Sequence, residues 1–206
     1  MPRRGAPPEV NAGSMADIAF LLLIFFLVTT TIETDSGLDR MLPPIEPPDE
    51  NVVIKQKNIF TVNINKNGQL LVEEELTDLR DLRSKAMAFL DNGGAPSGSP
   101  EYCSYCKGKR DPDSSDNPSK AIISLKNDRE TKYATYITVQ NELVGAYNEL
   151  RNREAQRLFG RDFTDMEAEY LNPETPDEIR EELKDKVQRV QDLFPQKLSE
   201  AETSTN

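Results

Sequence analysis

The sequence predicts a single-span membrane anchor followed by a small α+β domain of ββαβαβ-like order, with insertions. Three observations support this prediction: an apolar run over 15–32, an alternating strand pattern before a turn at 67–68, and amphipathic helix patterns over 78–91 and 133–158. Alternation is typical of half-buried strands, whereas apolar residues three and four positions apart are typical of helices. The expected segments are a tail (1–13), a transmembrane helix (14–33), a Pro-rich linker (34–51), the α+β domain (52–202) and a second tail (203–206).

The apolar run over 15–32 contains one charged side chain, that of Asp17. With a rise of about 1.5 Å per residue, a helix of this length just crosses a hydrocarbon core of roughly 30 Å. An ionisable group in such a helix costs about 2.5–3.5 kcal/mol on insertion scales. We therefore expect Asp17 to be a functional residue.

Three other interpretations of this run are open. Ser14-Met-Ala-Asp17 resembles a capping box, in which Ser14 is the N-cap and the carboxylate only stabilises the positive end of the helix dipole. The run could be the apolar region of a cleaved signal peptide, although Thr29-Thr-Thr31 offers no small-residue cleavage site. A buried core helix is the least favoured, because the run is apolar on all sides in an acidic chain.

Charge around the run predicts its orientation. Arg3 and Arg4 precede it, and the first basic residue after it is Arg40. The positive-inside rule then places the N-terminus in the cytoplasm and everything after Ile32, including the α+β domain, outside it. The linker has prolines at 43, 44, 47 and 48, which favour an extended polyproline spacer.

Composition limits the function. The net charge is −11, and residues 161–206, with 13 acidic and 6 basic residues, carry seven of these charges, so nucleic acid is not an expected partner. The chain has no histidine, which excludes Ser-His-Asp catalysis and His-based zinc catalysis. We expect no enzymatic activity, no cofactor and no metal site.

The first half of the domain begins with a strand over 59–65, in which Phe60, Val62 and Ile64 alternate with polar residues. Asn67-Gly68 is a hairpin turn signal, and 69–73 is the expected return strand. Thr77 is the expected N-cap of a helix over 78–91. Its predicted apolar face consists of Leu79, Leu82, Ala86 and Phe89.

The segment 92–119 is predicted to be an irregular insertion outside the core, because 14 of its 28 residues are Gly, Pro or Ser. It contains Cys103-Ser-Tyr-Cys106. A single C-x-x-C is a weak signal, since redox chemistry would require a strand-to-helix context and a zinc site would require two further ligands. We favour a local disulfide in an oxidising compartment.

The second half of the domain is predicted to contain a strand over 121–125 and a helix over 133–158. The core-facing stripe of that helix is expected to be Tyr136, Val139, Leu143, Tyr147 and Leu150. A second insertion, 160–194, is expected to be irregular up to 176 and then helical, because Thr175-Pro-Asp-Glu178 combines a capping box with proline at the first helical position. Its predicted apolar face consists of Ile179, Leu183, Val187, Val190 and Phe194. A last strand over 196–201 would point Leu198 inward and lie at a sheet edge, where it is a candidate homodimer contact.

Several motifs resemble those of the ExbD/TolR biopolymer-transport family. Asn11-Ala-Gly-Ser-Met-Ala-Asp17 followed by the apolar run is similar to the N-terminal signature of its members. Met41-Leu-Pro43 is similar to their Leu-Pro segment after the helix, and Lys126-Asn-Asp128 with Tyr133 is similar to their base-x-Asp and Tyr pattern. The chain departs from short members in both insertions and in Gly13-Ser14, where Thr-Pro is common.

The resemblance implies a subunit of a proton-motive-force-driven complex of the ExbB-ExbD-TonB type in the inner membrane. Its implied partners are an ExbB-like proton-channel ring and a TonB-like protein, and Asp17 would be the proton-carrying residue. A low-dielectric site favours the neutral form of a carboxyl, which agrees with this role. The helix face toward the channel, within about 40° of Asp17, would be Leu21, Ile24, Val28 and Thr31.

Two other functions compete with this one. The first is a membrane-anchored periplasmic binding protein, TolR-like and cell-wall associated, without proton coupling. In that case Asp17 would only cap its helix. The second is a secreted or anchored redox protein that uses Cys103 and Cys106.

Overall fold

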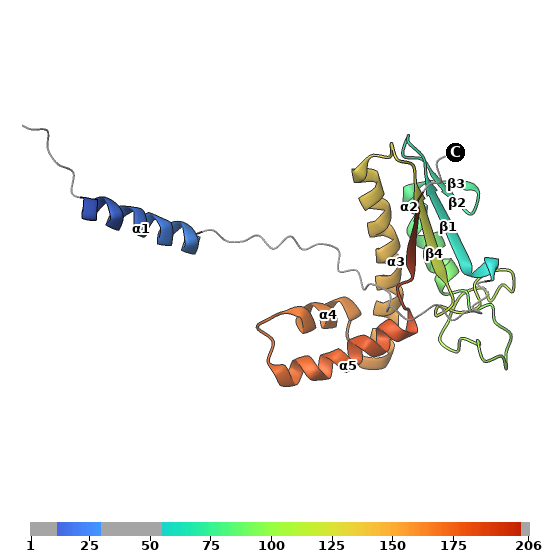
Figure 1. Ribbon diagram of the computed structural model, residues 1–206. Helices are drawn as coiled ribbons and strands as arrows, with labels where there is room; N and C mark the ends of the chain where they lie inside the picture. The colour runs from blue at the N-terminus through green and yellow to red at the C-terminus, as the bar shows by residue number, and fades with distance from the viewer. Residues whose placement is uncertain (1–11, 30–54, 203–206) are drawn as a thin grey trace, which may run out of the picture. The chain divides into compact units, whose positions relative to one another are not determined.

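The computed structural model describes residues 12–29 and 55–202, which belong to two units, Met1–Glu50 and Asn51–Asn206. The predicted linker (34–51), the tail 203–206, and Thr31 lie outside the described residues. In the first unit the structure describes one helix, α1 (Ala12–Thr29), drawn in blue in Figure 1. None of the helices in the described residues has the length and apolar character needed to cross a membrane.

The start of α1 corrects one prediction. The helix begins at Ala12, so Ser14 lies inside it and is not its N-cap. The continuous apolar run predicted the helix itself, whereas the small residues at 12 and 13 gave no indication that the helix would begin with them.

A five-stranded mixed sheet forms the centre of the second unit, in the order β3-β2-β1-β4-β5. Strands β1, β2 and β3 form an antiparallel meander, and β1, β4 and β5 run parallel. The strands are β1 (Ile59–Ile64), β2 (Leu70–Val72), β3 (Glu75–Thr77), β4 (Ile122–Asn127) and β5 (Leu198–Glu202). The predicted strands over 59–65, 69–73, 121–125 and 196–201 are confirmed, with shifts of at most two residues at their ends.

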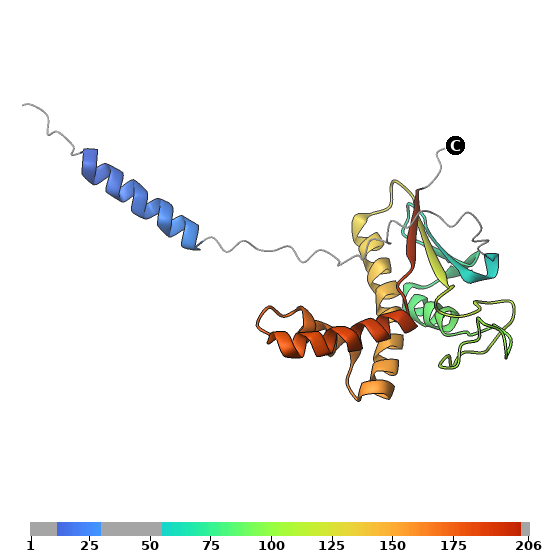
Figure 2. The same ribbon diagram turned by 60° about the horizontal axis from the view of Figure 1, so that its bottom comes forward.

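Helices α2 (Leu79–Leu90) and α3 (Tyr133–Phe159) pack together and cover one face of this sheet (Figures 1 and 2). Both helices were predicted. Alternate residues of β1 point into the core between the layers, which explains why the two-residue periodicity was strong there. The largest buried side chains of this core include Val62, Leu82, Leu90, Ile123, Leu125, Leu143, Tyr147, Leu150 and Phe194.

A second, smaller core lies at the C-terminal end of α3, where α4 (Phe163–Leu171) and α5 (Asp177–Leu193) extend away from the sheet (Figures 1 and 2). It contains Ala155, Phe163, Met166, Leu183, Val187 and Val190. The prediction that 160–176 is irregular was wrong. The Asn152 side chain of α3 accepts a hydrogen bond from the Thr164 backbone N–H at 3.0 Å, and this tertiary contact helps to start α4.

Strand β3 was not predicted, and the start of α2 was predicted one residue too early, with Thr77 as its N-cap. Glu73 and Glu74 both have positive φ, 49° and 67°, which forms a tight turn between β2 and β3 without glycine. Thr77 therefore ends β3, and Asp78 is the N-cap of α2, accepting a hydrogen bond from the Arg80 backbone N–H at 2.9 Å.

The predicted capping box of α5 was also wrong. The Thr175 hydroxyl donates a hydrogen bond to the Glu169 carbonyl oxygen at 2.6 Å, so it binds the end of α4 and does not cap α5. Ile179 was assigned to the apolar face, but its side chain is exposed. Leu183, Val187, Val190 and Phe194 are buried as predicted.

Candidate functional site

The first candidate site is the carboxylate of Asp17 on α1. The helix contains no lysine or arginine, and Asp17 is exposed among large exposed apolar side chains. The exposed fraction of these side chains ranges from 41% for Ile24 to 63% for Leu23. A helix that is apolar on all sides is typical of an apolar environment. Among the described side chains of α1, that of Asp17 is the only ionisable one.

Helical geometry groups the predicted channel-facing positions. Because α1 is continuous from Ala12 to Thr29, positions 17, 21, 24 and 28 fall on one side of it. Leu21 and Ile24 are exposed on that side. The side chain of residue 28 and all of residue 31 lie outside the described part of the chain.

The second candidate site is the sheet edge formed by β5. This strand pairs with β4 on one side, and no other described strand pairs with its outer side. The Tyr136 hydroxyl of α3 donates a hydrogen bond to the Glu200 carboxylate of β5. The Gln140 side-chain amide donates to the Tyr136 hydroxyl oxygen and to the Glu200 carboxylate, each at 2.6 Å. An edge strand presents unpaired backbone groups that another chain can pair with.

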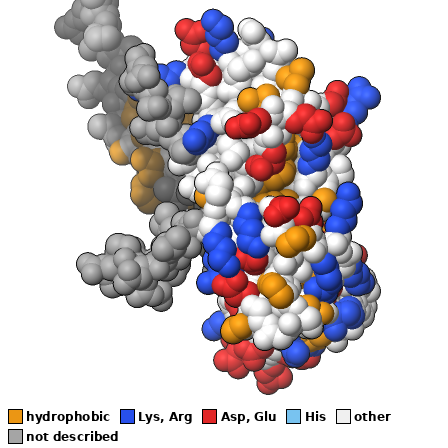
Figure 3. Space-filling view, turned by 90° about the vertical axis from the view of Figure 1, so that its right-hand side faces the viewer, with side chains coloured by type: hydrophobic (Ala, Val, Ile, Leu, Met, Phe, Trp, Pro, Cys, Tyr) orange, Lys and Arg blue, Asp and Glu red, His pale blue; other side chains and the backbone are white. Residues whose placement is uncertain are grey.

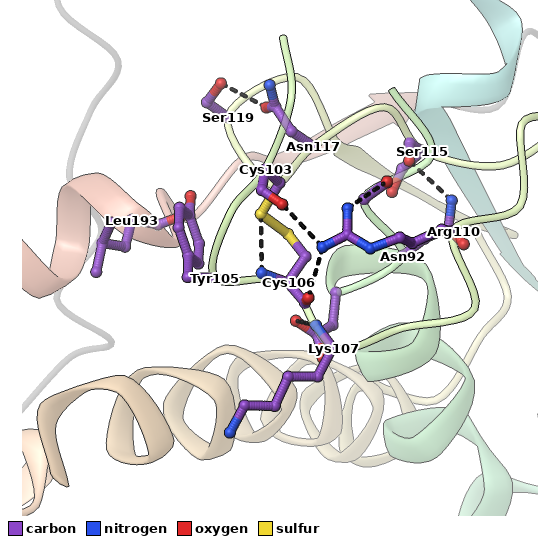
Figure 4. The surroundings of a disulfide bond; sticks show 12 residues. Asn92, Cys103, Tyr105, Cys106, Lys107, Arg110, Ser115, Asn117, Ser119 and Leu193 are labelled. Carbon is purple, nitrogen blue, oxygen red and sulfur yellow. Dashed lines mark hydrogen bonds between the residues drawn. A yellow bond between two sulfur atoms is a disulfide. The ribbon is translucent and has the colours of Figure 1, made fainter. Parts of the chain in front are cut away.

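The loop over 92–119 lies beside the start of β5, and Cys103 and Cys106 are joined by a disulfide in it (Figure 4). Within the loop no helix or strand forms, as predicted. The prediction that it lies outside the core was wrong: both cysteines are buried, and Tyr105 packs against the main core. The buried disulfide has little access to substrate thiols, which disfavours an oxidoreductase role.

A buried carboxylate fixes the end of this loop to the start of β1. Asp116 is buried and binds Lys57 at 2.6 Å, Lys55 at 3.1 Å and the Asn58 amide at 3.2 Å. Burial alone would raise the pKa of Asp116, but the hydrogen bonds from Lys57, Lys55 and Asn58 outweigh it and lower the pKa below its usual value. The sequence contained no signal for this contact, because its members are 58 or more residues apart.

A charged cluster on α3 joins this helix to the end of α2. Arg153 binds Asp91, and the buried Glu154 binds Arg153 at 3.2 Å and Arg157 at 2.7 Å. On the face drawn in Figure 3, basic, acidic and hydrophobic side chains are interspersed. Among the described residues no group of His, Cys, Asp and Glu is arranged to hold a metal ion.

These features define a class of protein: a small α+β domain whose chain also carries an apolar helix with a single carboxylate. The family model of biopolymer transport protein ExbD/TolR matches residues 3–152, and the chain belongs to this family. Its members are membrane-associated accessory proteins of transport and are not enzymes. The match includes Asp17 and ends before α4, so α4 and α5 lie outside it. No curated protein gave a significant match to the chain.

Proposed function

We propose that this chain is the proton-carrying, ExbD-like subunit of an energy-transducing complex of the ExbB-ExbD-TonB type. It would sit in the inner membrane with its N-terminus in the cytoplasm and its α+β domain in the periplasm, and it would power transport across the outer membrane. The observation that carries the proposal is the single carboxylate, Asp17, in an otherwise apolar exposed helix that lies within the family match.

In this proposal the apolar segment that contains α1 would be surrounded by a ring of ExbB-like subunits. The Asp17 carboxyl would be the group that is protonated and deprotonated as protons cross down the proton-motive force. The helix face proposed to meet the channel would be that of Leu21, Ile24, Val28 and Thr31, and the Thr31 hydroxyl would supply its polar group at the far end. The apolar positions between them provide no proton path, so polar groups of the ring must complete it.

The α+β domain would pass the resulting motion to a partner in the periplasm. Strand β5 pairs on its outer side with no other described strand, and this edge would pair with another chain, either a second copy in a homodimer or a segment of a TonB-like protein. The linker over 34–51 would separate this edge from the anchor.

A TolR-like function is the second candidate, because the matching family model covers both ExbD and TolR. In that case the domain would be a cell-wall-associated periplasmic binding protein without proton coupling. Asp17 distinguishes the two, since only the first function needs its proton.

Asp17→Asn tests the proposal in cells whose only copy of the gene encodes the variant. Asparagine keeps the size and hydrogen-bonding groups of the side chain but cannot release a proton. We expect normal amounts of variant in the membrane fraction and loss of the uptake that requires the wild-type chain and the proton-motive force. Asp35→Asn, a matched change just after the apolar run, should leave uptake unchanged. Wild-type uptake with Asp17→Asn would reject the proton-carrier role.

A further inference from the structure

Tyr105 links the disulfide loop to the junction between α5 and β5. Its hydroxyl donates a hydrogen bond to the Leu193 carbonyl oxygen at 2.7 Å (Figure 4). Its ring meets that of Phe194 edge-on, with 5.5 Å between the ring centroids. Phe194 is fully buried and is the C-cap of α5. Because β5 begins four residues later, at Leu198, Tyr105 fixes the segment that leads into the strand.

The disulfide holds Tyr105 in place, because Tyr105 lies between the two bonded cysteines. The Arg110 guanidinium donates to the carbonyl oxygens of Cys103 and Cys106 at 3.0 and 3.1 Å, which closes the turn from the other side. A Cβ at Gly93 would come within 2.8 Å of the Cys106 Cβ, so the bridged turn packs directly on the main chain that leaves α2. The turn therefore has little freedom to move while the bridge is intact.

The other end of the same loop also holds the entry to β5. The Lys197 ammonium donates to the Ser119 carbonyl oxygen at 2.6 Å, and the Ile123 backbone N–H donates to the Lys197 carbonyl oxygen at 2.9 Å. Beyond this entry, β5 pairs with β4 alone among the described strands, and Leu198 is only half-buried. The position of β5 thus depends on contacts from the loop as well as on its own pairing.

We propose that oxidation of Cys103 and Cys106 is a maturation step that stabilises the pairing of β5 with β4 in the sheet. The two thiols give up two protons and two electrons to the reactive disulfide of a thiol–disulfide oxidoreductase, which leaves as a dithiol, and the S–S bond forms between Cys103 and Cys106. Because both cysteines are buried in the finished loop, this exchange precedes closure of the loop over them. The proposal goes beyond the proton-carrier function and does not depend on it.

Hydrogen exchange of the full-length chain in detergent micelles tests this step. We expect the backbone amides of 197–202 to exchange about tenfold faster or more in Cys103→Ser/Cys106→Ser than in the oxidised wild-type protein. Amides in the centre of α2 should keep their rates in both. Wild-type protein folded under reductant should behave as the double variant does, and its reoxidation should restore slow exchange. Faster exchange confined to 103–110, with 197–202 unchanged, would overturn the proposal.

A second pair of variants tests whether the loop holds β5 if the double variant fails to fold. Tyr105→Phe keeps the ring and the disulfide but removes the hydrogen bond to Leu193, whereas Tyr102→Phe changes an exposed tyrosine of the same loop. We expect faster exchange over 193–202 in Tyr105→Phe and wild-type rates in Tyr102→Phe. Equal rates in the two variants would show that the loop does not hold β5 through Tyr105.

Discussion

Arg153 binds both carboxylate oxygens of Asp91, at 2.6 and 2.7 Å. Asp91 is the C-cap of α2, and Arg153 lies in the C-terminal part of α3. The Asp91 side chain is only 10% exposed and also accepts a hydrogen bond from the Lys107 backbone N–H. One carboxylate therefore joins α2, α3 and the disulfide loop.

Replacing this carboxylate should destabilise the domain. Asp91→Ala leaves the Arg153 guanidinium without its bidentate partner in a partly buried site, so we expect the free energy of unfolding to fall by about 2–4 kcal/mol. Chemical denaturation of the full-length chain in detergent measures this change. Arg80→Ala, which removes an exposed ion pair with 3.9 Å between Arg80 and Asp78, is the matched control and should have no measurable effect. Equal stability of the two variants would contradict the role given to Asp91.

Asp116 should contribute to the pH dependence of stability. Burial opposes its ionisation, but its bonds to Lys57, Lys55 and Asn58 lower the pKa of its carboxyl below the usual value. A lowered pKa in the folded state contributes stability that is present above the unfolded-state pKa of about 4 and is lost as the pH falls through the folded-state pKa. We expect Asp116→Asn to make unfolding free energy less dependent on pH below about 4, whereas Asp113→Asn, in the same loop, should not. The same pH dependence in both variants would contradict this assignment.

Tyr105 should titrate late at alkaline pH. Burial, followed by the charges of Glu154 and Asp91, raises the pKa of Tyr105 to about 12. The neutral phenol is favoured in the folded state, so its contribution to stability is present below about pH 10 and is lost as the pH rises toward 12. Tyrosinate absorbance is easily followed because the chain has no tryptophan. Tyr105→Phe should remove one late-titrating group, and an unchanged late phase would count against the burial of this phenol.

Local patterns predicted much of this fold. Phe60, Val62 and Ile64 alternate in the sequence and are buried in β1, and Leu143, Tyr147 and Leu150 share one face of α3, as their spacing indicates. Helix α4 and strand β3 were missed because their boundaries depend on an Asn152 side chain from another helix and on two glutamates with positive φ. Neither feature follows a common sequence rule.

The residues of the candidate sites were likewise predicted only where the signal is local in the sequence. Asp17 was evident because a charge within an apolar run is a local signal. Tyr105, by contrast, contacts Leu193, a residue 88 positions away, and nothing in the sequence near either residue indicates the pairing. Contacts of this kind depend on how the sheet and its crossover helices bring distant segments together.

A truncation experiment tests the contribution of β5, which lies at the edge of the described sheet. Removing residues 198–206 deletes the strand, leaves the outer side of β4 unpaired and removes the packing of Leu198 on the core. We expect a loss of about 2–4 kcal/mol in unfolding free energy. Removing only 203–206 should have no effect. Thermal unfolding of the two truncated chains, followed by circular dichroism, compares them directly, and equal melting temperatures would show that β5 contributes nothing to stability.

Proton flux tests the role of Asp17 most directly. The chain would be reconstituted in lipid vesicles with its ExbB-like partner, and proton entry would be followed with a pH-sensitive dye inside the vesicles under an imposed membrane potential. We expect flux with the wild-type chain and with Asp35→Asn, and none above the background of empty vesicles with Asp17→Asn, because the variant retains the helix but cannot carry a proton. Wild-type flux through complexes that contain Asp17→Asn would contradict the account.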